Sequence, residues 1–305
     1  MRNHRRLLAL CPLLLLVVSS VAVLANSVPT VYVSVLGEDG QYSSCTRSSP
    51  CKTIARALSM VSTGGVVDIV SSGAYDAFTV SHAVTVKADQ GVTATINIPP
   101  PTATTSSIGI TIQPQANDVV DLQHLAVQGA GGMGVGIEVS GGARVTVEDC
   151  VSRGGAYGIT YGSGTPSTLK VVGGIYEGSN TGIYLTSGNN KVNVDNVTVY
   201  GGGAWAGINA DGQDITIANS LISGDGGPYG VFVINNARVV LKGNTISNFD
   251  TAVIGNGRVY FSENVITNNN YGAYGNFGSF YSSGDNTIIG NNIADALSLG
   301  YFSAQ

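Results

Sequence analysis

Few residues of this 305-residue chain could do acid–base chemistry, since charged residues make up only 11% of it. Asp211 and Asp225 lie in glycine-containing turns, and Arg153 precedes a Gly-Gly pair. Glycoside hydrolysis needs two carboxylates that face one bond, one of them with a raised pKa. The spacing of the two aspartates does not require such a pair, because Asp beside Gly commonly serves turn geometry. Arg153, Asp211 and Asp225 are candidate catalytic residues, and a structural role is the favoured explanation for the aspartates.

Sulfur and imidazole groups form no clear metal-binding pattern. Cys45 and Cys51 flank a short loop, and in an oxidising compartment this spacing predicts a disulfide that staples the N-terminal segment. There is no second cysteine pair, and His82 and His124 lie far away in the sequence. Cys150 sits among apolar and β-branched residues, which predicts a buried hydrophobe rather than a nucleophile. We therefore predict no metal site.

The first 25 residues have the features of a secretory signal peptide. They contain three arginines, an apolar run over 7–18 and small residues before the expected cleavage site at Ala25. A membrane anchor is the alternative, but Ser19 and Ser20 interrupt the run and no basic stop-transfer cluster follows. We predict cleavage, export to the periplasm or beyond it, and no transmembrane segment afterwards.

Charge limits the class of partner. Without the signal peptide, 11 basic and 19 acidic residues remain, a net charge of −8. No Lys/Arg cluster follows residue 25 in the sequence, which argues against nucleic acid, because phosphate polymers are bound by basic stripes. An acidic polysaccharide would be repelled unless a local basic patch or a divalent cation compensates. Neutral glycans, cations and protein surfaces remain open as partners.

A repeat of about 23 residues dominates the chain. Its 42 glycines and 43% apolar residues exclude disorder and favour many short strands. Each unit opens with Gly-Ile or Gly-Val, as at Gly158-Ile159 and Gly182-Ile183, continues with an alternating Val-x-Val segment, and ends in a short β-branched segment. Three strands per unit fit one coil of a parallel β-helix, whose coils pair about 4.8 Å apart. A propeller blade would need about 40 residues.

Asparagine follows the second segment in most repeats. A buried amide that stacks on its copies above and below satisfies its own donors and acceptors. We therefore predict an internal asparagine ladder. Because a ladder position is buried, the glycosylation sequon Asn196-Val-Thr198 is discounted. The predicted ladder residues are Asn196, Asn219, Asn244, Asn264 and Asn286.

The opening of the chain carries a family resemblance. It contains Tyr32-Val-Ser, Gly37-Glu-Asp39, the segment Cys51-Lys-Thr-Ile-Ala-Arg-Ala-Leu58 and Gly64-Gly65, followed by the repeats. From Val31 to about Asn292 the chain resembles secreted bacterial right-handed parallel β-helix proteins of the pectin lyase-like fold, from a largely uncharacterised branch. The resemblance implies an all-β, three-sheet solenoid with a short N-terminal capping helix over 52–61. The resemblance indicates the fold specifically, but it says little about activity, because this fold hosts lyases, hydrolases, adhesins and tailspikes.

This resemblance sets the expected organisation of the chain. After the signal peptide (1–25), an N-terminal segment with the capping helix and the disulfide spans 26–76. The β-helix coils span 77–292, and residues 293–305 form a closing turn or a loose tail. In carbohydrate-active members of the fold, the ladder lies between the second and third strands, which makes the Gly-Ile segment the first sheet, where such enzymes bind substrate.

Alternation along the first sheet turns one column of side chains outward. This column contains three aromatic rings, which can stack on sugar rings or bury against another protein. Trp205, on a turn leading into the sheet, extends the same surface. The ligand-binding candidates are Glu138, Tyr184, Trp205, Asn209, Phe232 and Tyr274.

Three hypotheses about function follow. The leading one is an exported, non-catalytic surface protein that binds a glycan or a protein partner along the first sheet. The alternative is a polysaccharide lyase or glycoside hydrolase with atypical active-site residues; calcium would be a cofactor only in a lyase, with Arg153 as the basic residue near the sheet. The third is a structural spike or an oligomer. His124 has no recognisable catalytic partner, so we expect it at a ladder or surface position.

Overall fold

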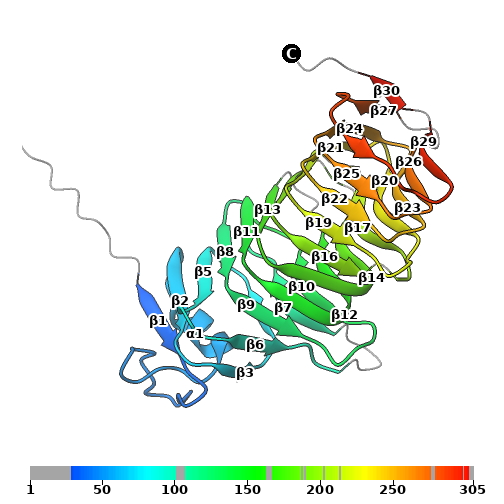
Figure 1. The fold of residues 1–305 in the computed structure, drawn as a ribbon. Coiled ribbons are helices and arrows are strands. Elements are labelled where there is room, and N and C mark those ends of the chain that lie inside the picture. Colours follow the sequence, from blue (N-terminus) through cyan, green and yellow to red (C-terminus); the bar gives the residue numbers. More distant parts are fainter. Residues whose placement is uncertain are drawn as a thin grey trace, which may run out of the picture.

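The chain winds into an elongated parallel β-solenoid (Figure 1). The computed structural model describes residues 29–100, 107–162, 167–186, 188, 190–201, 203–212, 214–275, 279–297 and 299–301. The expected signal peptide (1–25) lies outside these ranges. The parallel pairing of successive strands confirms the parallel β-helix predicted from the repeat. No helix in the described part of the chain has the length and apolarity needed to span a membrane.

The Val-x-Val segments of successive repeats build one long parallel sheet, which we call the second sheet. Most of its inward positions are Val, Ile, Leu or Phe, and they form much of the core. Its strands, in spatial order, are β1 (Thr30–Val33), β2 (Gly65–Ile69), β5 (Val84–Ala88), β8 (Val119–Gln123), β11 (Arg144–Glu148), β13 (Thr168–Val172), β15 (Lys191–Asp195), β18 (Asp214–Ala218), β21 (Arg238–Lys242), β24 (Arg258–Ser262), β27 (Ser279–Ser282) and β30 (Leu299–Tyr301).

The other two sheets, called first and third, join through two long bent strands, β12 (Val151–Tyr161) and β14 (Ile175–Leu185). The first sheet also contains β4 (Phe78–Val80), β7 (Ile108–Ile112), β10 (Val135–Val139), β17 (Ala206–Asp211), β20 (Tyr229–Ile234), β23 (Thr251–Gly255), β26 (Tyr271–Gly275) and β29 (Ala294–Leu297). The third sheet contains β3 (Gly73–Tyr75), β6 (Ala94–Asn97), β9 (Leu125–Gln128), β16 (Thr198–Gly201), β19 (Leu221–Ser223), β22 (Thr245–Ser247), β25 (Val265–Thr267) and β28 (Thr287–Ile288).

The repeated glycine lies where the chain enters the first sheet. A Cβ atom on Gly182 would collide with the side chain of Val199, and one on Gly230 would collide with the carbonyl oxygen of Ala252. The following residue, Ile183 or Val231, is fully buried. Glycine therefore lets neighbouring coils approach closely at this corner, which is the physical basis of the Gly-Ile and Gly-Val repeat.

The single helix in the described ranges, α1 (Ile54–Met60), covers the N-terminal end of the solenoid (Figure 1). Thr53 caps it by accepting a hydrogen bond from the backbone N–H of Arg56 at 3.1 Å. Asp39 in turn accepts hydrogen bonds from the backbone N–H and the hydroxyl of Thr53. The helix packs against β1, β2 and β4. The predicted capping helix is confirmed.

The disulfide between Cys45 and Cys51 is also confirmed. Both cysteines are fully buried. The loop that they close lies beside β1, because the backbone N–H of Tyr32 donates to the carbonyl oxygen of Cys45 and the backbone N–H of Cys51 donates to the carbonyl oxygen of Tyr32. At the other end of the chain, β29 and β30 continue the first and second sheets. Residues 294–297 and 299–301 thus add strands to the solenoid, within the segment expected to form a closing turn or a loose tail.

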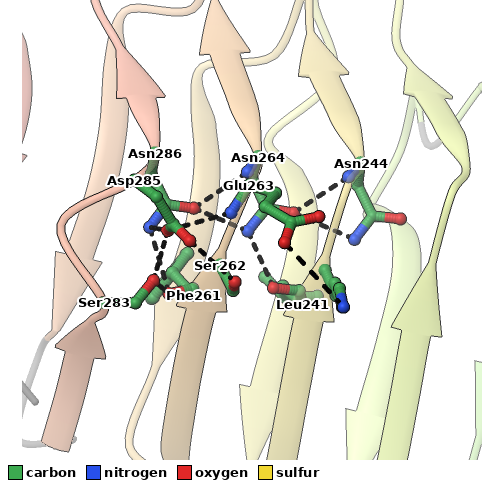
Figure 2. A network of polar contacts seen from close by, with 10 residues as sticks. Leu241, Asn244, Phe261, Ser262, Glu263, Asn264, Ser283, Asp285 and Asn286 are labelled. Atoms are coloured by element: carbon green, nitrogen blue, oxygen red, sulfur yellow. Dashed lines mark hydrogen bonds and ion pairs between the residues drawn. The ribbon is translucent and has the colours of Figure 1, made fainter. Parts of the chain in front are cut away.

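The asparagine ladder exists over three coils (Figure 2). The Nδ2 group of Asn244 donates to Oδ1 of Asn264 at 3.1 Å, and Nδ2 of Asn264 donates to Oδ1 of Asn286 at 2.9 Å. Oδ1 of Asn264 also accepts a hydrogen bond from the backbone N–H of Asn244, and Oδ1 of Asn286 accepts one from the backbone N–H of Asn264. Asn244 and Asn264 are almost completely buried.

Asn196 and Asn219 do not belong to this ladder, and for them the prediction is wrong. They stand one residue earlier in their turns, are exposed, and have positive φ angles of 53° and 50°. The ladder position of the second of these turns is taken by Ser220, whose backbone N–H donates to Oδ1 of Asn244. Burial is therefore no reason to discount the sequon at Asn196.

A second amide ladder, beyond the predicted one, stands where the third sheet leads into the first. Asn269 donates to Oδ1 of Asn291 at 3.0 Å and accepts the backbone N–H of Phe249 at 3.0 Å. The sequence signal is the run Asn268-Asn269-Asn270, which recurs one coil later as Asn291-Asn292. These turns border the first sheet and help to position its edge.

Candidate functional site

The outward column of the first sheet has the predicted composition and register. Each successive pair of its members is aligned between neighbouring strands, from Glu138 through Tyr184, Asn209 and Phe232 to Tyr274. The sheet therefore brings side chains separated by more than twenty residues into one line.

A second set of outward rings lies immediately before the repeated glycine. Tyr157, Tyr229 and Tyr271 occupy aligned positions in their coils, and each is half-buried. These tyrosines were not among the predicted residues, although the recurring Tyr-Gly dipeptide was visible in the sequence. They place further rings beside the first column, on the other side of the inward-facing glycine and the residue after it.

Contacts between rings make this surface continuous in its centre. Trp205, which is 40% exposed, meets Phe232 edge-on with the ring centroids 5.2 Å apart and Tyr229 at 5.7 Å. Tyr229 and Phe232 are stacked, with centroids 4.9 Å apart. We call the whole surface the aromatic strip; it comprises Tyr157, Tyr184, Trp205, Tyr229, Phe232, Tyr271 and Tyr274.

Two pairs extend the aromatic strip towards its ends. Tyr157 contacts Tyr184 with centroids 5.4 Å apart, and Tyr271 contacts Tyr274 at 6.5 Å. Burial, followed by the neighbouring Tyr157 and Asp211, raises the pKa of Tyr184. Its hydroxyl group therefore remains neutral at ordinary pH and can donate a hydrogen bond.

Two predicted ligand-binding residues differ from the rest. Asn209 is 1% exposed, and its Nδ2 group donates to the carbonyl oxygen of Leu185 at 3.2 Å. The register places Asn209 between Tyr184 and Phe232, so it separates these two rings. Because it is buried, its amide is not accessible to a ligand. Glu138 is half-buried at the N-terminal end of the column, beyond the aromatic rings.

A polar groove of about 400 Å³ runs along the edge at which the chain enters the first sheet. Asn270 donates to Oδ1 of Asp250 at 2.8 Å, and Asn292 donates to Oδ1 of Asn270 at 3.0 Å. Asp250 and Asn270 directly precede β23 and β26 of the first sheet. We call this the amide groove; its polar side chains are those of Asp225, Asn248, Asp250, Asn268, Asn270 and Asn292, together with the buried ladder residue Asn269.

The structure does not bring the candidate catalytic residues together. Asp211 ends β17 and accepts a hydrogen bond from Asn235 at 2.7 Å, whereas Asp225 precedes β20 on the opposite edge of the sheet. The length of β17 separates the two edges, about 16 Å at a rise near 3.3 Å per residue, compared with about 5–9.5 Å between the carboxylates of glycosidases. Arg153 is engaged with Glu177, Nε to Oε2 3.4 Å.

Three comparisons with known proteins extend this description. A family model described as "Periplasmic copper-binding protein (NosD)" matches residues 101–303. No curated protein sequence matches the chain.

Solved structures of similar fold include a rhamnogalacturonan lyase, 12% identical, which covers 90% of this chain and 86% of its own with a TM-score of 0.52. A GH136 lacto-N-biosidase from Eubacterium ramulus is 10% identical and covers 90% of this chain and 68% of its own, with a TM-score of 0.54. The pectate lyase Pel9A is 18% identical, and the match covers 88% of this chain and 79% of the lyase, with a TM-score of 0.48. At these identities the likeness shows the fold alone.

The described residues do not fit a copper centre of the kind that the family description suggests. No three His, Cys, Asp or Glu side chains within the described ranges come close enough to hold a metal ion. His124 lies 3.8 Å from Asp149, Nε2 to Oδ2, in an exposed turn. Burial raises the pKa of the Cys150 thiol to about 12, so this sulfur stays protonated and is a poor ligand.

Proposed function

This chain belongs to the NosD family, and from that relationship we propose that it is an exported, periplasmic β-helix protein that binds a neutral glycan chain along the aromatic strip. The observation that carries the proposal is the row of three groups of contacting rings on the outward face of the first sheet. Trp205, Tyr229 and Phe232 form its centre.

The chemistry of the aromatic strip suits a sugar chain. Aromatic faces and edges pack against the apolar C–H faces of pyranose rings, while Tyr hydroxyls and the Trp N–H donate hydrogen bonds. The amide groove beside it supplies carboxylate and amide groups for sugar hydroxyls. Aromatic side chains with a few polar groups that fix the orientation of the ligand are typical of binding sites.

Charge near the aromatic strip favours a neutral ligand over an acidic one. The turns that border it carry Glu177, Asp211, Asp225 and Asp250, and the one arginine among them, Arg153, is paired with Glu177. An acidic polymer would be repelled by this edge. The names of two proteins of similar fold, a rhamnogalacturonan lyase and a lacto-N-biosidase, describe enzymes that act on glycans, which supports a glycan as the class of ligand.

We propose binding without catalysis because the candidate carboxylates lie on opposite edges of the first sheet. The test is a panel of neutral and acidic polysaccharides, with retained binding, new reducing ends and the ultraviolet absorbance of unsaturated sugars measured together. We expect binding of a neutral polysaccharide without products. Unsaturated products would instead show a lyase, and new reducing ends alone would show a hydrolase.

Variants locate the binding surface. We expect Trp205→Ala and Phe232→Ala each to weaken binding about tenfold, equivalent to about 1.4 kcal/mol. The matched control is Tyr200→Ala on the third sheet, because Tyr200 is 41% exposed and Trp205 is 40% exposed. If both first-sheet variants bind within twofold of the unsubstituted protein, or if the control loses as much, the aromatic strip is not the binding surface.

A further inference from the structure

Basic residues gather on the outward face of the second sheet, although they are far apart in the sequence. Two neighbouring outward columns run across β11, β13, β15, β18, β21 and β24, as the strand registers show. Five of the 14 lysines and arginines of the chain stand in these two columns. They are Arg144, Lys170, Lys191, Arg238 and Arg258.

Only one carboxylate stands in the same two columns. Asp214 lies between Lys191 and Arg238 in the register and accepts a hydrogen bond of 2.9 Å from Nε of Arg238. Among the described residues, no ion pair involves the other four basic side chains. The face is therefore locally positive on a chain whose net charge is −5.

A groove of about 590 Å³ lies across this face. Lys191, Arg238 and Asp214 line it together with the polar side chains of Asn193 and Thr216. The ring of Tyr260 also lines it and is backed by the stacked ring of Tyr281, with centroids 5.4 Å apart and an angle of 19° between the planes. We call this the basic groove.

We propose that the basic groove is a second ligand site, for a linear acidic glycan whose sugars carry carboxylates. Successive strands are about 4.8 Å apart, so Lys191, Arg238 and Arg258 place cationic groups along roughly 14 Å of the face. Asn193 and Thr216 supply hydrogen bonds for hydroxyl groups between the charges, and Tyr260 forms an apolar wall for a sugar ring.

The spacing of these charges distinguishes an acidic glycan from nucleic acid. A DNA strand carries one charge about every 3.4 Å, and a long phosphate polymer would also meet the net negative charge of the rest of the chain. Cationic groups one or more strands apart fit a polymer with one acidic group per sugar. The site does not depend on the proposed function of the aromatic strip, because it lies on a different sheet and binds a ligand of opposite charge preference.

The test measures the affinity of the full-length mature protein for polygalacturonate in the presence of EDTA, which removes bridging cations. We expect binding that weakens at least tenfold between about 50 and 200 mM salt. Lys191→Glu combined with Arg258→Glu should weaken it at least tenfold further. Lys191→Glu alone should weaken it about threefold or more, whereas Lys52→Glu, an equal charge change at an exposed position near α1, should leave it within twofold.

Several outcomes would overturn the proposal. These are no binding of polygalacturonate, binding that needs a divalent cation, equal loss in the Lys52→Glu control, or tighter binding of a single-stranded oligonucleotide. The variant Arg258→Lys keeps the charge and should retain most of the affinity. Trp205→Ala should not affect polygalacturonate binding, so failure of the aromatic-strip proposal and failure of this one give different results.

Discussion

The side-chain amide of Asn244 donates to Oδ1 of Asn264 across neighbouring coils at 3.1 Å. The two residues are 20 positions apart in the chain, and both are 1% exposed. Asn264 also donates to the carbonyl oxygen of Leu241 at 2.7 Å and accepts the backbone N–H of Asn244 at 3.0 Å. One buried side chain therefore satisfies polar groups of two coils at once.

Replacing Asn264 should cost more than replacing a polar residue of the exposed turn. Asn264→Ala leaves a buried N–H and a carbonyl without partners, so we expect a loss of about 1–3 kcal/mol in the free energy of unfolding. The control is Asn196→Gly, because Asn196 is exposed with positive φ, and Gly173 and Gly243 occupy the same turn position with positive φ in other coils. It should change stability by less than about 0.5 kcal/mol. Urea denaturation measures both, and equal losses would contradict the ladder as a stabilising element.

The sequence predicted the ladder but not its extent, for a physical reason. Asn219 and Asn244 are 25 residues apart, and a shift of one residue moves a side chain from the exposed left-handed position to the buried one. Asn is favoured at both positions, in the first because it tolerates positive φ and in the second because its amide can bridge coils. Residue type alone could not separate the two roles.

Glycine at the corner of each coil should be needed for close packing. In Gly230→Ala the new Cβ would collide with the carbonyl oxygen of Ala252 in the next coil, so the strands must shift. We expect a loss of about 1–3 kcal/mol in stability, the usual cost of overpacking. Gly40→Ala is the control, because a Cβ there meets nothing within 4 Å. Thermal unfolding compares the two, and an unchanged Tm for Gly230→Ala would show that the corner has room.

The candidate surfaces show what a repeat can and cannot predict. Alternation along the Gly-Ile segments correctly aligned Tyr184 with Phe232 and Tyr274, because a column needs only the strand period. The basic groove could not be seen in this way. Lys191 and Arg238 are 47 residues apart, and only the stacking of coils turns that separation into a distance of two strands.

The short disulfide should stabilise the N-terminal end. Cys45 and Cys51 are six residues apart, and closing a loop of that size is expected to contribute about 2 kcal/mol through the entropy of the unfolded chain. Replacing both cysteines by Ala should lower the Tm, and a reducing agent should lower the Tm of the unsubstituted protein by a similar amount. The reducing agent should have no further effect on the variant. A Tm that reduction leaves unchanged would show that the loop is held by its hydrogen bonds alone.

Cys150 should behave as an inert thiol whose ionisation is coupled to unfolding. Burial raises its pKa from the ordinary 9.0 to about 12. Between these two values the unfolded chain loses the thiol proton while the folded chain keeps it, so stability is fully present below pH 9 and falls as the pH rises towards 12. We expect labelling by a thiol reagent at pH 8.5 to be at least about a hundredfold slower in the folded protein than in urea. The Cys150→Ala variant should lose stability less steeply above pH 9, and equal slopes for the two proteins, or rapid labelling of the folded one, would show that this sulfur is accessible.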